Sequence, residues 1–400
     1  MTLSLFKETW LHLIRNSKNR LTIVLVFIGI IFYSGFFLTK QSVYDTIDLD
    51  QLKMSVQSNK GIMETATEKG NFNINLFTGK SAYAEGKYKY ENSRALLAAI
   101  ENGDVGRYIE LTSVYTPDFH FEEKNKYYNE NSLYPMKDWA YDSANYRNRI
   151  GSYDPDILSF HVLQEKTSWQ QIQLFLHNWG PTILIVLTLF IASDVFVLGV
   201  RKRTQHIGVP IGWGHYLFTQ SLAILSFVLI FFAVAALLFF IVNGLLYGFG
   251  SVSWQVPLFN YSEDYMMNPD VYSLMSIGSF LVKAVPFLLM FLYLFIRLSA
   301  LLSLLFRQEV VVFVAGLFVL LFEKLYFSRT TRDIFCIDIS HFPQTYFDFG
   351  KVISGEKNFM LNTPTITVNQ GLIVITVTLI GVEVLLAIAS YIRTRQKFIG

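Results

Sequence analysis

The sequence predicts an α-helical integral membrane protein with six membrane-spanning helices, and three observations predict it. The 400 residues are 52% hydrophobic and only 16% charged, whereas soluble domains carry about a quarter charged residues. The apolar residues gather in runs close to the roughly 20 residues that a helix needs to cross a bilayer. Lys and Arg lie at the ends of these runs and favour one side. The single cysteine, Cys336, excludes a secreted domain held by intrachain disulfides.

The predicted spans are the six longest apolar runs, at residues 21–39, 179–200, 217–242, 274–297, 310–326 and 371–392. The fifth run is the shortest. Residues 298–306 before it are apolar too, so the boundary between the fourth and fifth spans stays open. The first run is too long for the apolar core of a cleaved signal peptide, and no small-x-small site follows it, so we interpret it as an uncleaved anchor.

The positive charges predict the orientation of the spans. Lys7, Arg15, Lys18 and Arg20 precede the first span, and Arg201, Lys202 and Arg203 follow the second. Arg297 precedes the connector 298–309 and Arg307 lies within it, and the tail 393–400 carries Arg393, Arg395 and Lys397. The loop 243–273 carries acidic residues and no Lys or Arg. We therefore expect a multi-pass protein of the cell membrane with both termini in the cytoplasm. The outer loop 327–370 carries four cations, but it is long enough for the rule to relax.

Residues 40–178 form a predicted extracellular domain that is mostly helical. ENSRALLAAIENGDVGRYIEL predicts two helices separated by a Gly-Asp break, and DFHFEEK alternates like a short strand. The domain ends in TSWQQIQLFLHNW, where Trp169, Ile172, Leu176 and Trp179 share one helical face. We expect an interfacial helix there that leads into the second span.

The sequence carries no motif of a catalytic site, and we predict no cofactor or metal in this chain. Gly-Lys-Ser at 79–81 matches the last three residues of the phosphate-binding loop motif, but Ile74 stands at the position of the first glycine of that motif. Asp118, His120 and Glu122 are alternate residues, so on a strand they would share one face and could together hold a metal. A solvated strand face, with Phe119 and Phe121 inward, is the simpler interpretation.

Residues 1–20 predict an amphipathic helix, called the elbow helix below, at the cytoplasmic interface. Its apolar face holds Leu3, Phe6, Trp10, Leu13 and Ile14, whereas Lys7, Glu8, His12 and Arg15 lie elsewhere. Two roles fit this pattern. The helix either anchors the chain or acts as a lever that touches a cytoplasmic partner through Phe6, Trp10 and Arg15.

The cytoplasmic segment 201–216, RKRTQHIGVPIGWGHY, is more elaborate than a simple connector between two spans. Its first residues extend the second span as a helix, and Gly208-Val209-Pro210-Ile211-Gly212 then breaks that helix. The aromatic residues after the break start a new helix. A helix–break–helix of this size fits a groove of a soluble subunit. The expected contact residues are Arg201, Arg203, Thr204, Ile207, Val209, Pro210, Ile211 and Trp213.

At these residues the chain resembles a permease subunit of an ABC transporter of the second exporter class, as found in Gram-positive bacteria. Members carry an elbow helix and a loop between spans two and three that reads like E-R-x-x-G-T-x-x-x-L-x-x-P-x-S-R-x-x. Thr204, Pro210 and Gly212 match that pattern in order, whereas Gly199 and Val200 stand where the family has an acidic residue. The resemblance extends to TSWQQIQLFLHNW, to ENGDVGRYIEL and to PQTYFDFGKVISGE, where similar permeases read N-P-x-x-Y. It covers most of the chain, with loose motifs.

The resemblance implies a complex of two permeases, identical or homologous, with two ABC ATPase subunits that hold ATP and Mg. The 201–216 segment would be the coupling helix, and the cargo would be a peptide, an antimicrobial compound or drug, or an envelope lipid. No predicted cytoplasmic segment exceeds the 20 residues at the N-terminus, so ATP hydrolysis needs another chain. The predicted partners are these subunits and the lipid bilayer, and no nucleic acid.

Two alternatives remain. One is an ABC-linked mechanotransmitter, although such chains usually have four spans. The other is a sensor or scaffold that acts through its extracellular domain without transport. Binding of an ATPase would distinguish the permease and the mechanotransmitter from the sensor or scaffold.

Ionisable groups inside a span are costly and favour a functional role. Three stand out well within the predicted spans: Asp194, Lys283 and Glu383. The fourth and sixth spans run in the same direction. Lys283 and Glu383 lie at depths that agree within roughly 5 Å at 1.5 Å per residue. We predict that they form an ion pair, either as a structural staple or as a polar contact for substrate or for a switch between states.

Overall fold

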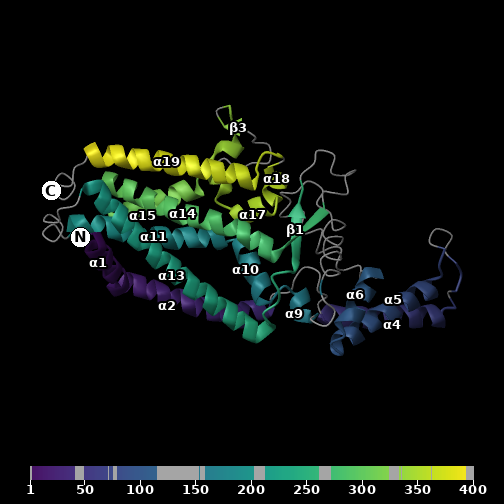
Figure 1. Cartoon of the computed structure of the whole chain (residues 1–400). Coiled ribbons are helices and arrows are strands. Elements are labelled where there is room, and N and C mark those ends of the chain that lie inside the picture. The colour runs from purple at the N-terminus through teal and green to yellow at the C-terminus, as the bar shows by residue number, and fades with distance from the viewer. Residues whose placement is uncertain are drawn as a thin grey trace. The chain divides into compact units, whose positions relative to one another are not determined.

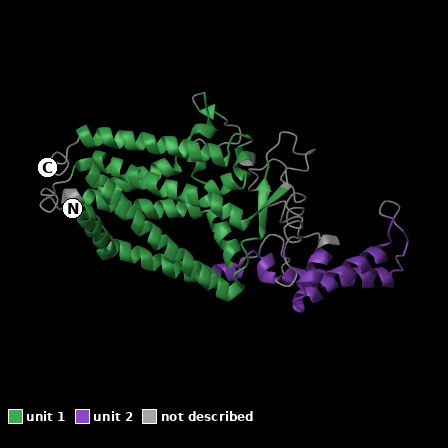
Figure 2. Ribbon diagram, in the orientation of Figure 1, with its two compact units in different colours: residues 1–36, 168–400 green, residues 37–167 purple. Residues whose placement is uncertain are grey.

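The computed structural model describes residues 2–40, 49–70, 72–74, 79–114, 153, 158–201, 212–260, 272–323, 333–334, 336–361 and 363–392. The chain divides into two compact units, drawn in different colours in Figure 2. Unit 1 comprises residues 1–36 and 168–400, and unit 2 comprises residues 37–167.

Five helices in the described part of the chain are long and apolar enough to cross a membrane. One begins as α2 (Ser17–Phe32) and continues through a π-helical turn, η1 (Tyr33–Phe37), and α3 (Leu38–Lys40). The others are α11 (Gly180–Arg201), α13 (Trp213–Tyr247), α14 (Ile277–Leu305) and α19 (Val368–Ile392). The predicted class, an α-helical membrane protein, is confirmed at this level.

The predicted sixth span corresponds in part to α15 (Glu309–Leu321), which has 13 residues and is the shortest of the apolar helices. Residues 324–326 of that span lie outside the described residues. The count of six spans therefore stays a prediction, as do the side of the membrane on which each loop lies and the positions of the termini.

The helices of unit 1 share a common direction and define two ends (Figure 1). The elbow end holds α1 (Thr2–Arg15), the start of α13 and the C-terminal ends of α11, α14 and α19. The hairpin end holds the other ends of these helices, together with α10 (Ser168–His177), α17 (Phe349–Ile353), α18 (Glu356–Leu361) and an antiparallel pair of strands, β1 (Gln255–Phe259) and β2 (Tyr272–Ser276).

The centre of unit 1 is α14, whose aromatic residues follow the helical period. Phe280, Phe287, Phe291 and Phe295 are all fully buried, at spacings that place them on one face. The rings of Phe287 and Phe291 lie 5.9 and 6.2 Å from that of Phe349, between ring centroids. Side-chain stacking of this kind fixes α17 against α14. Ser276 caps the N-terminus of α14 by accepting a hydrogen bond from the backbone N–H of Ser279.

Two glycines allow the close packing of the hairpin end. A Cβ atom on Gly350 of α17 would lie 2.2 Å from the backbone oxygen of Leu176, so α17 contacts the end of α10 through bare backbone. Gly355 has φ +75°, and a Cβ atom there would lie 2.0 Å from the backbone oxygen of Phe259. The remaining short elements of this end are β3 (Asp333–Ile334), β4 (Ile337–Asp338) and the 3₁₀ turns η4 (Ile339–His341) and η5 (Pro343–Tyr346).

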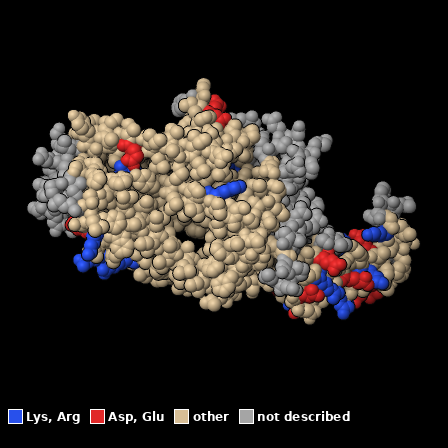
Figure 3. All heavy atoms as spheres, viewed as in Figure 1, with Lys and Arg blue, Asp and Glu red and all other residues tan. Residues whose placement is uncertain are grey.

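Unit 2 is helical throughout its longer described segments, with α4 (Leu49–Glu68), α5 (Ala82–Glu101), α6 (Val105–Val114) and α9 (Phe160–Leu163). The predicted helix, break and helix are confirmed, because α5 and α6 are separated at Gly103, which has φ +69°. Ser81 of the Gly-Lys-Ser tripeptide caps α5 through the backbone N–H of Ala84. Figure 3 shows both signs of charge over α4 and α5, whereas the drawn face of unit 1 is mostly uncharged. The predicted strand at 118–122 lies outside the described residues.

Several helices extend beyond the spans that the sequence predicts. α14 continues through Leu305, so 298–305 of the predicted connector is helical. α13 begins at Trp213 and ends at Tyr247, where Gly248 with φ +94° stops it. The residues of the predicted interfacial helix form α10, which belongs to unit 1, whereas unit 2 ends at Thr167. The extracellular position of residues 40–178 stays a prediction.

Candidate functional site

The joint between α1 and α2 is attached to α11 by a buried carboxylate. Asn16 separates the two helices and caps α2 by accepting a hydrogen bond from the backbone N–H of Lys18. Its Nδ2 donates to Oδ2 of Asp194, 2.5 Å away, and Asp194 is 7% exposed. His12 Nε2 lies 3.8 Å from the same carboxylate oxygen. One side chain of α11 thus contacts the elbow helix and the start of α2.

A cation on the other side of the joint adds a second attachment to α11. The Nζ atom of Lys18 donates to the backbone oxygen of Phe190 at 2.7 Å and lies 4.0 Å from the centroid of the Phe190 ring. Within the joint, Asn19 Nδ2 donates to the backbone oxygen of Leu13, and Arg20 Nε donates to that of Ile14. These bonds satisfy backbone oxygens at the end of α1 that have no partner within the helix.

The elbow helix packs against α13, the helix that follows the 201–216 segment. Trp10 Nε1 donates to Oγ of Ser226 at 3.1 Å, and the Trp10 ring meets Phe227 edge-on, 6.0 Å between centroids. The elbow helix is therefore fixed to both helices that flank the 201–216 segment, to α11 through Asp194 and to α13 through Trp10.

The structure corrects the predicted face of the elbow helix. Leu5, Thr9 and Leu13 are its buried side chains, and the predicted face residues Leu3 and Ile14 are exposed. Phe6 is half-buried, and Arg15 is exposed at the end of α1. Thr9 can lie on the buried face because its hydroxyl donates to the backbone oxygen of Leu5, which satisfies the hydroxyl within the helix.

Most of the predicted coupling residues lie outside the described residues: Arg203, Thr204, Ile207, Val209, Pro210 and Ile211. Arg201 is the last residue of α11. Trp213 begins α13, as the sequence predicts for the helix after the break, and its ring stacks on Tyr216 with 5.4 Å between centroids. The roles of these residues remain predictions.

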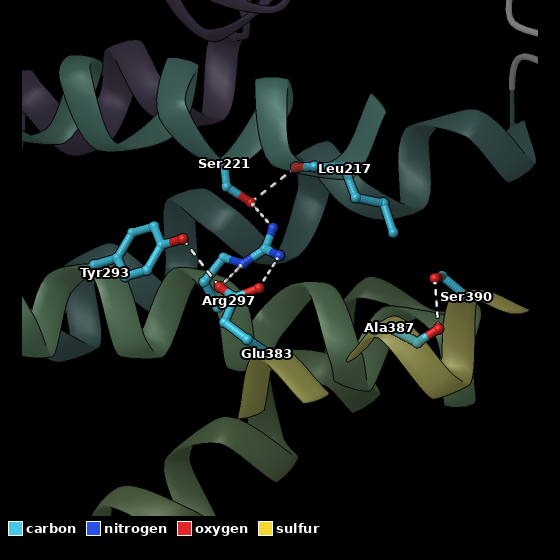
Figure 4. A network of polar contacts seen from close by, with 7 residues as sticks. All are labelled: Leu217, Ser221, Tyr293, Arg297, Glu383, Ala387 and Ser390. Carbon is cyan, nitrogen blue, oxygen red and sulfur yellow. Dashed lines mark hydrogen bonds and ion pairs between the residues drawn. The ribbon is translucent and has the colours of Figure 1, made fainter. Parts of the chain in front are cut away.

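Glu383 belongs to a polar network that joins three long helices in the half of unit 1 toward the elbow end (Figure 4). Arg297 of α14 donates from Nε and Nη2 to the two carboxylate oxygens of Glu383 of α19, a bidentate ion pair. Tyr293 donates to Oε1 of Glu383 at 2.9 Å, and Nη1 of Arg297 donates to Oγ of Ser221 of α13 at 3.0 Å. Arg297 is 3% exposed, whereas the Glu383 side chain is 36% exposed.

The predicted ion pair between Lys283 and Glu383 is wrong. Glu383 pairs with Arg297, which is 14 residues farther along α14 than Lys283. That spacing is about 21 Å along a helix, and Lys283 is exposed. Hydropathy places Arg297 at the cytoplasmic end of the fourth span, and this placement leaves Lys283 as the expected partner of Glu383. With α14 continuing to Leu305, the buried Arg297 is the cation nearest to the carboxylate, and it offers two parallel donors where Lys offers a point charge.

One feature of the sequence does indicate that Arg297 lies inside a helix. The apolar residues 298–306 continue the pattern beyond it, so Arg297 sits inside a long apolar run rather than at its end. The contacts of Asn16 and Ser221 carry no comparable signal, because polar residues of these types are ordinary at helix ends and within apolar helices.

A second buried group of ionisable residues lies at the hairpin end, on α10 and α18 and just beyond the end of α15. His177 Nε2 lies 2.9 Å from Oε2 of Glu356 and 3.1 Å from Oγ of Ser354. Lys357, which follows Glu356, is 1% exposed, and its Nζ lies 2.6 Å from Oε1 of Glu323. These pairs tie α18 to the end of α10 and to Glu323, two residues beyond α15.

Burial at this group predicts a pH dependence of stability. Burial raises the pKa of Glu356 from 4.5 to about 8, against a smaller lowering by Lys357. The folded protein therefore holds a proton there that the unfolded chain releases above about pH 4.5. The stability contribution is lost as the pH rises toward 8. We expect the melting temperature of the wild type to fall more steeply from pH 5 to pH 8 than that of Glu356→Gln, which cannot ionise. Parallel melting curves of the two proteins would contradict this assignment.

No known protein family, curated protein or solved structure matches this chain.

Proposed function

We propose that this chain is the membrane permease subunit of an ATP-driven exporter, whose ATPase is a separate protein that docks on the 201–216 segment and the elbow helix. The attachment of the elbow helix to α11 and α13 carries this proposal. A push on the elbow end by a soluble subunit would reach two candidate spans at once, through Asp194 and through Ser226. A helix that served only as an anchor would need no polar contacts to the spans.

The Arg297–Glu383 network extends the same path. The elbow helix contacts α13 at Ser226, and α13 contacts Arg297 through Ser221, little more than one turn earlier. Arg297 then holds α19 through Glu383. Four helices are thus linked by side-chain hydrogen bonds near the elbow end. A displacement of α1 relative to α13 would change the packing around Ser221, which supports a role in switching between states.

The orientation within the proposal can be tested with the native cysteine. Cys336 is exposed, and it lies in the loop that we place outside the cell. We expect a membrane-impermeant maleimide to label intact cells that carry the wild-type chain, but not those that carry Cys336→Ser. In the Cys336→Ser background, His206→Cys should react only after the membrane is opened. Labelling of His206→Cys in intact cells would place the 201–216 segment outside and exclude docking of a cytoplasmic ATPase.

The function itself is tested by gentle extraction of the tagged chain from its native membrane. We expect a soluble ATPase to co-purify, and we expect replacement of Val209, Pro210 and Ile211 by glycine to release it while the chain remains folded. If no ATPase accompanies the chain in several mild detergents, the exporter proposal fails. A sensor or scaffold that acts through unit 2 then becomes the better account.

A further inference from the structure

A layer of uncharged polar side chains lies between η1, α10 and α13 toward the hairpin end, and we call it the polar layer. It consists of Tyr33, Ser34, Ser168, Gln171, Asn243 and Tyr247. Tyr33 donates to Oε1 of Gln171 at 3.2 Å, and Tyr247 donates to the backbone oxygen of Ser34 at 2.7 Å. Ser168 donates to the backbone oxygen of Phe240 at 2.6 Å.

The side chains of two members of the polar layer have no hydrogen-bond partner among the described residues. Asn243 is 0% exposed, and neither Nδ2 nor Oδ1 of its amide is bonded. The hydroxyl of Ser34 is also 0% exposed and unbonded. Asn243 precedes Tyr247 by one turn on the same face of α13. Because tyrosine side chains on helices point back toward the N-terminus, the Tyr247 hydroxyl and Ser34 lie near the level of Asn243. The ring of Tyr33 lies 6.2 Å from that of Phe239, between centroids, which places α2 beside this stretch of α13.

An unbonded amide within an apolar bundle is costly. Leaving a buried polar group without partners costs about 1–3 kcal/mol in proteins, and such groups are rare enough to need an explanation. Both side chains are 0% exposed, so an outside partner can reach them only when the packing around them opens. Ser34 lies in η1, at the end of the helix that begins as α2, and Asn243 lies in α13. The contact between these two helices is therefore the place where such an opening would admit a partner.

The attachment of α2 to the bundle permits such a movement. Between the joint at Asn19 and Ser34, no side chain of α2 is fully buried. Ile23, Val26 and Phe27 are partly buried against the core of unit 1, with the Phe27 ring 6.2 Å from that of Phe231, between centroids. The π-helical turn at Tyr33–Phe37 interrupts the regular hydrogen-bond ladder next to Ser34, and such turns are frequent at functional sites.

We propose that Asn243 and Ser34 form a binding site for an uncharged hydroxyl- or amide-bearing compound, which enters between α2 and α13. The amide of Asn243 offers two donors and an acceptor, and the Ser34 hydroxyl offers one more of each. No member of the polar layer is Lys, Arg, Asp or Glu, so a charged ligand would lie there without a counter-ion. The rings of Tyr33 and Phe239 supply an apolar wall. This inference does not depend on an ATPase partner.

The test compares the melting temperature of the full chain in lipid nanodiscs with that of Asn243→Leu, which has nearly the shape of Asn without the amide. If the amide is unbonded at rest, the variant should melt higher by about 2–4 °C, because an unsatisfied group has been removed. Acetamide should then raise the melting temperature of the wild type more than that of the variant. Acetate, its charged isostere, should not discriminate between them.

Two outcomes overturn the proposal. If Asn243→Leu melts lower than the wild type, the amide has partners in the resting protein. If acetamide shifts both proteins equally, no ligand uses the amide. Should Asn243→Leu fail to fold, Ser34→Ala provides the same comparison with a smaller cavity change, and the loss of its differential response to acetamide is the expected result.

Discussion

Replacing Glu383 by leucine is expected to destabilise the protein more than replacing its partner, Arg297, by methionine. The Glu383 change leaves a guanidinium that is 3% exposed without its carboxylate, and Arg cannot lose its charge in a protein. Removing one member of a buried pair costs about 3–5 kcal/mol. The Arg297 change leaves a carboxylate that is 36% exposed, can take up a proton and keeps the hydrogen bond from Tyr293. Its cost should be nearer about 1–3 kcal/mol.

The double variant, Arg297→Met with Glu383→Leu, shows whether the two side chains stabilise the protein through their interaction or independently of each other. Apolar residues of similar volume can replace a buried ion pair with little loss, so the double variant should be more stable than Glu383→Leu alone. Folded yield and melting temperature in mild detergent measure the difference. Lys283→Met is the matched control, since Lys283 is exposed and far from the network, and it should have a small effect. Additive losses in the double variant would show that Arg297 and Glu383 do not interact.

Replacing Asp194 by alanine is expected to release the elbow helix. The carboxylate accepts the hydrogen bond from Asn16, and hydrogen bonds to charged groups contribute about 1.5–3 kcal/mol. Trypsin can report the release, because Arg15 and Arg20 flank the joint and must unfold locally to be cut. If opening is fast relative to cleavage, the rate of cleavage follows the open population. We expect an increase of about ten- to a hundredfold.

Two comparisons give this experiment its specificity. Glu8→Gln changes an exposed carboxylate on the same helix and should leave the cleavage rate unchanged. Asn16→Ala removes both the bond to Asp194 and the cap of α2, so it should accelerate cleavage at least as much. Adding Asp194→Ala to Asn16→Ala should then change little. Equal rates for wild type and Asp194→Ala would show that the joint is held by apolar packing alone.

The apolar pattern was sufficient to predict the class of the protein and the existence of most helices. The runs in α13 and α19 are apolar over most of their length, as a long membrane helix requires. The C-terminal end of α14 is harder to predict from the sequence. Arg297 interrupts an apolar run, yet the helix continues beyond it to Leu305. Hydropathy alone treats a charge as a boundary, whereas a bidentate partner on another helix allows the charge to remain inside.

The contacts within the site were not predictable in the same way. Asp194, Lys283 and Glu383 stand out in the sequence because charges in spans are rare, but the choice of partner depends on rotation and depth of packed helices. Helical spacing predicts which residues share a face and does not predict which neighbour the face meets. The same reason explains why the buried face of the elbow helix differs from the predicted one. The apolar pattern predicts an amphipathic helix, but the side chains that pack are Leu5, Thr9 and Leu13.

Photo-crosslinking in living cells tests the central claim most directly, namely that a soluble ATPase docks on the elbow end. p-Benzoylphenylalanine is placed at Ile207, in the 201–216 segment, and at Cys336 as the control toward the opposite side. The account predicts a light-dependent adduct of this chain with an ATPase subunit from position 207 and none from position 336. An absence of any ATPase adduct from position 207 in a chain that is folded and inserted, or an equal adduct from both positions, would contradict it.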